Sequence, residues 1–148
     1  APGRVLPGVV EAVEAARGRA AIGLLTGNYR AGAHVKLDHF GLWARFSPVI
    51  GAFGDDAGVR EDLVPIAVRR ARRRGVSPTR VVVVGDTPAD VRCARAGHAA
   101  LAHRGVDVVS ICVTTGWATH AELQAAGSDV IVSDLREGLP ELLALIDG

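Results

Sequence analysis

The sequence contains no methionine, only two cysteines (Cys93 and Cys112) and few aromatic residues, which make up 4% of the chain. Two cysteines cannot form a disulfide framework, and their spacing is not that of a metal site, so they fit a reducing cytosol. No apolar run is long enough to span a membrane, and no signal peptide is visible. These absences predict a cytoplasmic protein with no membrane partner.

The sequence also lacks a large excess of charge of either sign, because the formal net charge is +1. The only basic run, residues 69–74, falls at the end of a predicted helix, where cations meet the negative end of the helix dipole. The sequence therefore predicts no nucleic-acid partner, and it leaves the oligomeric state open. Because methionine is absent and the chain opens with Ala1, we expect these residues to be the later part of a longer polypeptide.

What is present is aliphatic: 49% of the 148 residues are hydrophobic, enough for one α/β domain over residues 1–148. Apolar runs and turn residues alternate in a pattern typical of a parallel sheet covered by helices on both faces, a three-layer, Rossmann-like sandwich. The predicted helices cover residues 9–16, 30–42, 61–74, 88–104 and 140–146, with another between Thr119 and Gly127. The predicted strands cover residues 20–25, 48–53, 81–84, 108–113 and 130–132.

The segment 81–90 is the centre of this pattern. Four consecutive valines predict a strand buried on both faces, and Gly85 ends it. Asp86 and Asp90 then lie four residues apart on a helix start, so both carboxylates face the same side. Two close carboxylates are favourable when a cation lies between them, and at the carboxyl end of a parallel strand the natural ion is magnesium.

A plain helix start explains the same residues. Thr87 or Asp86 as N-cap, Pro88 at the first helical position and Asp90 in the first turn satisfy the usual capping preferences. Taken alone, the segment favours this structural interpretation. The other strand ends shift the balance toward a site.

Polar residues follow the other predicted strands at the same edge of the sheet. Thr26, Gly27 and Asn28 follow the predicted strand at 20–25. Arg60 directly precedes the predicted helix at 61–74. A hydroxyl group, backbone N–H groups and one cation are what a phosphate group needs, while a metal neutralises phosphoryl charge. The sequence therefore predicts a site for a phosphate group and a divalent metal.

The segments 24–28 and 83–90, with a basic residue between them, resemble the later motifs of the haloacid dehalogenase-like (HAD) hydrolase superfamily. The resemblance covers nearly the whole chain and implies a magnesium-dependent phosphatase that acts through an aspartyl-phosphate intermediate. It implies that Thr26 bonds the transferring phosphoryl group, that Gly27 and Asn28 lie at the phosphate and substrate, and that Asp86 and Asp90 hold Mg²⁺. Arg60 matches the basic catalytic residue, with Lys36 as its rival.

One departure from the family is large, because its nucleophile lies in an Asp-x-Asp motif and none occurs here. We expect that motif, its strand and the substrate-selecting cap in a segment outside these residues. Two alternatives stay open. A 2-haloacid dehalogenase of the same fold needs no magnesium, and a receiver-like or nucleotide-binding α/β module would bind without turnover.

Overall fold

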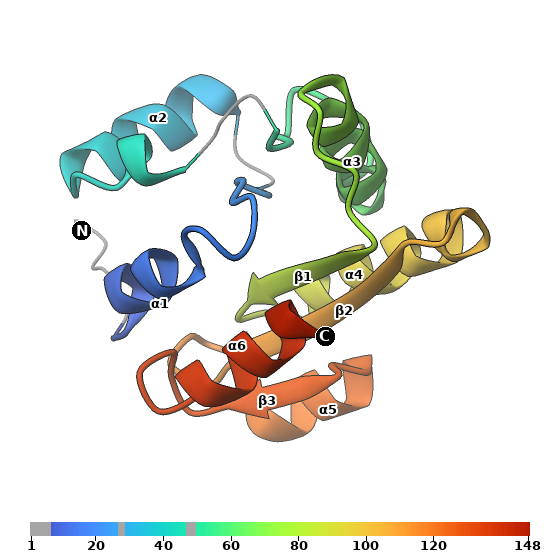
Figure 1. The fold of residues 1–148 in the computed structure, drawn as a ribbon. Coiled ribbons are helices and arrows are strands. Elements are labelled where there is room, and N and C mark those ends of the chain that lie inside the picture. The colour runs from blue at the N-terminus through green and yellow to red at the C-terminus, as the bar shows by residue number, and fades with distance from the viewer. Residues whose placement is uncertain (1–6, 27–28, 47–49) are drawn as a thin grey trace.

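The computed structural model describes residues 7–26, 29–46 and 50–148 (Figure 1). Its strands are β1 (Arg80–Gly85), β2 (Asp107–Val113) and β3 (Val130–Val132). Its α-helices are α1 (Val9–Ala16), α2 (Arg30–His39), α3 (Leu63–Arg73), α4 (Pro88–Leu101), α5 (His120–Ala126) and α6 (Leu139–Asp147), and its single 3₁₀ turns are η1 (Trp43–Arg45), η2 (Arg60–Asp62) and η3 (Ala102–Arg104). The predicted helices are confirmed, although α2 ends earlier than expected.

The three strands form one parallel sheet in the order β1-β2-β3. Val83 pairs with Ser110, and Cys112 pairs with Ile131. Parallel neighbours need a crossover connection, which α4 supplies between β1 and β2 and α5 supplies between β2 and β3. All three strands therefore end at the same edge of the sheet.

Helices cover both faces of this sheet. Alternate strand residues point to opposite faces, so Val83 and Cys112 pack toward α3, α4 and α5, while Ile111 and Val113 pack toward α1 and α6. Figure 1 shows α6 crossing in front of the strands and α4 behind them. The predicted α/β class with three layers is confirmed.

Gly97 explains how α3 and α4 pack closely against each other. A Cβ atom at Gly97 would lie 2.7 Å from Cγ1 and 2.8 Å from Cβ of Val64. Glycine usually weakens a helix, but here its missing side chain gives the neighbouring helix room. The two helices run side by side from the sheet edge that carries Asp86, because Arg60 contacts Asp90 and Val64 contacts Gly97.

The predicted strand over residues 20–25 is wrong. The structure has only isolated bridges there, one between Arg17 and Ala20 and one between Leu25 and Ala52. At the second, Ala52 N–H donates to Leu24 O at 2.8 Å and Thr26 N–H donates to Ala52 O at 3.2 Å. The predicted strand at 48–53 is reduced to the same bridge, and residues 48 and 49 lie outside the described residues. A strand needs a neighbour along several residues, and these segments pair at one position.

The valines of β1 are less buried than their sequence predicts. Val83 is buried, but Val84 is 45% exposed, and Val81 and Val82 are intermediate. The reason is topological, because within the described residues β1 pairs with β2 only and is an edge strand. Its other edge carries backbone groups that no described strand pairs.

Both cysteines are unpaired and buried, as expected for thiols used as small apolar residues. Burial raises the pKa of the Cys93 thiol to about 11, so it is a poor nucleophile at neutral pH. In the part of the chain that the structure describes, every helix is too short or too polar to cross a membrane.

An ion pair connects α3 to the loop after the Leu25–Ala52 bridge. The guanidinium of Arg70 donates to both carboxylate oxygens of Asp56, at 2.6 and 2.8 Å, and to Gly51 O at 2.8 Å. Phe53 N–H also donates to Asp56 at 2.7 Å. The Arg70 hydrogen bond is the main reason that the pKa of Asp56 lies below its ordinary value.

This pair makes stability depend on acid pH. A carboxyl group whose pKa is lower in the folded state contributes stability above its ordinary pKa and loses it as the pH falls through the lowered value. We expect Arg70→Gln to reduce the free energy of unfolding by about 1–2 kcal/mol near neutral pH and by much less near pH 2. Urea denaturation at both pH values measures this, with Arg73→Gln as the control on the same helix. An equal loss at both pH values would contradict the assignment.

Candidate functional site

Asp86 directly follows β1 and begins the short loop that leads to α4. The loop that follows β2 comes close to it, because a Cβ atom at Gly116 would lie 2.3 Å from Asp86 Oδ2 and 3.0 Å from Asp86 Cγ. Two strand ends therefore meet at this carboxylate. The carboxyl edge of a parallel sheet is where open α/β folds bind ligands.

Asp90 is held tightly by the start of α4. Its Oδ2 accepts hydrogen bonds from the N–H groups of Asp86 and Thr87, both at 3.0 Å, and from the Thr87 hydroxyl at 2.9 Å. In return, Asp90 N–H donates to Thr87 Oγ1 at 3.3 Å, which completes a capping box with Pro88 at the first helical position. The helix-start interpretation of this segment is confirmed for Asp90.

Arg60 reaches the same carboxylate from η2. Its Nη2 atom donates to Asp90 Oδ1 at 2.6 Å, and the Arg60 side chain remains 39% exposed. The Cys93 thiol donates to the Arg60 carbonyl oxygen at 3.4 Å, which ties η2 to α4. The rival Lys36 lies in the last turn of α2 with an exposed side chain. Arg60 is therefore the cation that lies beside the acidic motif in this geometry.

The electrostatics of Asp86 favour a nearby cation. Burial raises the pKa of Asp86, the negative charge of Asp90 raises it further, and Arg60 opposes both effects. A charged carboxylate in this position is costly unless positive charge approaches it. Both oxygens of Asp90 already have partners, so Asp86 is the carboxylate better suited to direct contact with a metal ion.

The donors at this edge fit magnesium but do not enclose it. In the described part of the chain, no three His, Cys, Asp or Glu side chains form a group that could hold a metal ion. Magnesium usually keeps several water ligands and binds through one or two carboxylates together with phosphate oxygens. Asp86 and Asp90 are two carboxylates at this edge, and only that of Asp86 is not already held by Arg60 and the start of α4.

The proposed phosphate-binding residues lie on another segment. Thr26 follows the Leu25–Ala52 bridge, and its N–H donates to Ala52 O at 3.2 Å. Gly27 and Asn28 lie outside the described residues. Just beyond them, Arg30 N–H at the start of α2 donates to Asp55 Oδ1 at 3.1 Å, so Asp55 joins two loops, as a turn residue can.

Sequence reasoning missed the two glycines that allow this edge to form. A Cβ atom at Gly85 would lie 2.4 Å from Cβ and 2.5 Å from Cγ of Asp90, so the capping box needs glycine at the end of β1. Gly116 plays the corresponding part beside Asp86. The signal was a glycine at or just beyond each of two neighbouring strand ends, which is typical of close backbone approach.

Trp117 lies beside the loop at Thr115, and its side chain is 99% exposed, so it does not cover that loop. The Thr115 hydroxyl is buried and has no hydrogen-bond partner within the described residues. An unpaired buried hydroxyl is unfavourable, so this loop is a region that a ligand or water would stabilise.

Gly116 offers a direct test of the geometry around Asp86. We expect Gly116→Ala to leave the free energy of unfolding within about 1 kcal/mol of the original protein, because the clash is with the mobile end of a side chain. The Asp86 carboxylate must rotate away, so affinity for magnesium should fall by about tenfold or more. Gly58→Ala, which places its Cβ in open space, is the matched control. Unchanged magnesium affinity in Gly116→Ala would contradict the arrangement.

Comparisons with known proteins show the family to which the chain belongs. A model of haloacid dehalogenase-like hydrolases matches residues 1–98, and a HAD-hydrolase-like model matches residues 59–138. The probable phosphatase IndB of Dickeya dadantii is 32% identical over 148 residues, which cover 99% of this chain and 59% of IndB.

Solved structures share the fold. A predicted phosphatase from Clostridium acetobutylicum superposes with a TM-score of 0.72 at 21% identity, over 94% of this chain and 60% of its own. A HAD family hydrolase from Deinococcus radiodurans, solved with bound phosphate and sodium, gives a TM-score of 0.61 at 25% identity, over 95% of this chain and 61% of its own. The chain thus spans about three fifths of these relatives. With a family model matching residues 1–98 of its 148, the chain belongs to the haloacid dehalogenase-like hydrolase family.

Proposed function

We propose that this chain forms the magnesium- and phosphate-binding part of a cytoplasmic phosphatase that acts on a small phosphorylated metabolite. The observation that carries the proposal is the cluster at the end of β1, where Asp86, Asp90 and Arg60 meet. The phosphate bound to the Deinococcus hydrolase and the name of the Dickeya relative support the same activity.

The residues take distinct parts in the proposed reaction. Thr26, with Gly27 and Asn28, donates hydrogen bonds to the phosphoryl oxygens, and Arg60 adds positive charge beside them. Asp86 would hold the metal ion, which would supply positive charge to the phosphoryl group.

Asp90 acts mainly by position. Because it accepts hydrogen bonds from the N–H groups of Asp86 and Thr87, it fixes the backbone that presents the Asp86 carboxylate. Arg60 has a planar, forked guanidinium group at the position where the resemblance implies a lysine. Its contact with Asp90 aligns this group with the acidic motif.

The nucleophile comes from a segment outside this sequence, because no Asp-x-Asp motif occurs in it. Within the described residues, the outer edge of β1 pairs with no strand, so a further parallel strand can add there and carry an aspartate to the site. That aspartate would take the phosphoryl group as an aspartyl phosphate, which water then hydrolyses.

Release of phosphate from a panel of small phosphorylated molecules tests this proposal, with magnesium and then with EDTA. We expect release that depends on magnesium, and an intact mass of the active protein clearly above 15.4 kDa. Metal binding without turnover would favour the receiver-like or nucleotide-binding module instead. Metal-independent release of halide from a 2-haloacid would favour the dehalogenase. Either result would overturn the proposal.

A further inference from the structure

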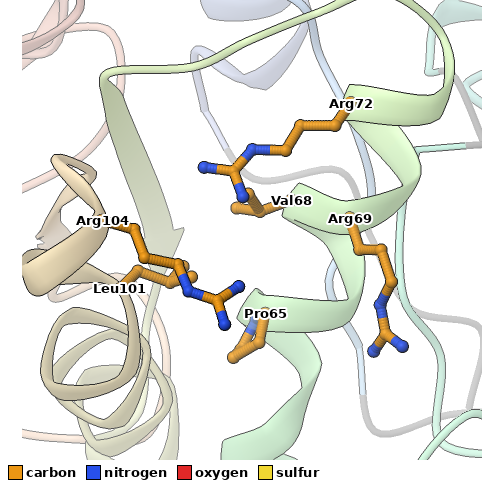
Figure 2. A pocket seen from close by; sticks show the side chains of 6 residues that line it. All are labelled: Pro65, Val68, Arg69, Arg72, Leu101 and Arg104. Atoms are coloured by element: carbon orange, nitrogen blue, oxygen red, sulfur yellow. The ribbon is translucent and has the colours of Figure 1, made fainter.

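A second feature lies far from the acidic motif, between α3 and the end of α4. It is a hollow of about 350 Å³. We call it the basic hollow, and its lining residues are Pro65, Val68, Arg69, Arg72, Leu101 and Arg104 (Figure 2). Three of the six side chains carry a guanidinium group.

The guanidinium groups reach the basic hollow from two elements. Figure 2 shows the side chains of Arg72 on α3 and Arg104 on η3 extending toward each other across the gap, while Arg69 lies farther along the outer side of α3. The apolar floor includes Val68 and Leu101, which are 3% and 4% exposed. A charged rim over an apolar floor is the usual construction of a small-ligand site.

Among the residues that the structure describes, these three charges have no acidic partners. Within the described residues, the ion pairs of the chain leave out Arg69, Arg72 and Arg104, although the neighbouring Arg70 turns away to bind Asp56. The end of α3 offsets only about half an elementary charge through its dipole. The basic hollow therefore keeps a surplus of positive charge that an anion would neutralise.

The basic hollow is separate from the candidate active site. Asp90 lies in the first turn of α4, and Leu101 ends the same helix about three turns later, roughly 16 Å away at the standard rise. Because α3 runs alongside α4, the carboxyl-terminal half of α3 lies toward the amino-terminal ends of the strands. A ligand in the basic hollow would leave the Asp86 edge open.

We propose that the basic hollow binds a small molecule that carries a diphosphate or longer phosphate chain. Guanidinium forks bind phosphate oxygens in pairs, and two forks facing each other can hold two neighbouring phosphate groups. The volume matches a small ligand, and the whole chain has a net charge of only +1, so no overall excess of positive charge favours a nucleic-acid backbone.

Calorimetric titration of the purified protein with inorganic pyrophosphate in EDTA tests the proposal. We expect one site, weakened about tenfold or more by Arg72→Gln and by Arg104→Gln, because each removes a charge-assisted hydrogen bond. Arg73→Gln, which removes the same charge from the same helix end outside the basic hollow, should weaken binding less than about threefold. Arg60→Gln, which removes the cation beside the acidic motif, should also weaken it less than about threefold.

Several results would overturn the proposal. These are absence of pyrophosphate binding, equal weakening by Arg72→Gln, Arg104→Gln and Arg73→Gln, and weakening by about tenfold or more in Arg60→Gln, which would place the anion at the other site. Tight binding of a single-stranded oligonucleotide with no binding of pyrophosphate would assign the arginines to nucleic acid instead. Circular dichroism confirms that each variant is folded before titration.

Discussion

Replacing Asp90 with alanine is expected to lower the free energy of unfolding by about 2–3 kcal/mol, which corresponds to a fall in melting temperature of roughly 5–10 °C. The substitution leaves the N–H groups of Asp86 and Thr87 without their acceptor and removes the partner of Arg60. The Arg60 contact adds little to this sum because its side chain is 39% exposed and solvent screens the pair. Thermal denaturation followed by circular dichroism measures the effect.

Two variants separate the contributions. Asp90→Asn keeps an oxygen acceptor for the backbone and should lose about 1 kcal/mol, mainly from the missing charge. Glu122→Ala on α5 is the matched control, because Glu122 occupies the same position after its N-cap, Thr119, without a contact to arginine. If Asp90→Ala were no more destabilising than Glu122→Ala, the capping role assigned to Asp90 would be wrong.

Asp86→Asn should have the opposite effect on stability and the largest effect on activity. Burial and the Asp90 charge raise the pKa of Asp86, so above that raised pKa the charged carboxylate destabilises the folded protein. Asparagine removes this charge, and the free energy of unfolding should stay the same or increase. Magnesium-dependent phosphate release should fall by about 100-fold or more, because asparagine is a neutral and weaker ligand.

This pair of opposite changes is characteristic of a site that trades stability for function. Asp107→Asn is the control, since Asp107 begins β2 at the other end of the sheet. The Asp107→Asn substitution should leave phosphate release unchanged. A variant Asp86→Asn that was both less stable and fully active would mean that Asp86 has a structural role only.

The second half of the chain could be predicted closely from its sequence. Gly127 in the left-handed conformation ends α5, Thr119 caps that helix, and the runs at β2 and β3 are mostly apolar, so local preferences agree with the fold. The two strands expected in the first half could not, because an apolar run such as residues 20–25 becomes a strand only when it has a neighbour to pair with. Pairing partners are set by tertiary structure.

The acidic motif shows a different limit of sequence reasoning. Two interpretations of Asp90, as metal ligand and as capping residue, were both consistent with its spacing, and the structure shows the capping contacts. The contact between Gly116 and Asp86 joins loops from different strands. No local sequence pattern specifies such a contact, and the glycine at position 116 is the only sequence feature that indicates it.

Direct measurement of magnesium binding tests the central claim, that the carboxyl edge of β1 is a metal site. Calorimetric titration of the purified protein with Mg²⁺ in the presence of orthophosphate should give one site per chain. Asp86→Asn should weaken that site by about tenfold or more, while Asp107→Asn should leave it unchanged. Absence of magnesium binding in the original protein, or equal affinity in Asp86→Asn, would contradict the claim.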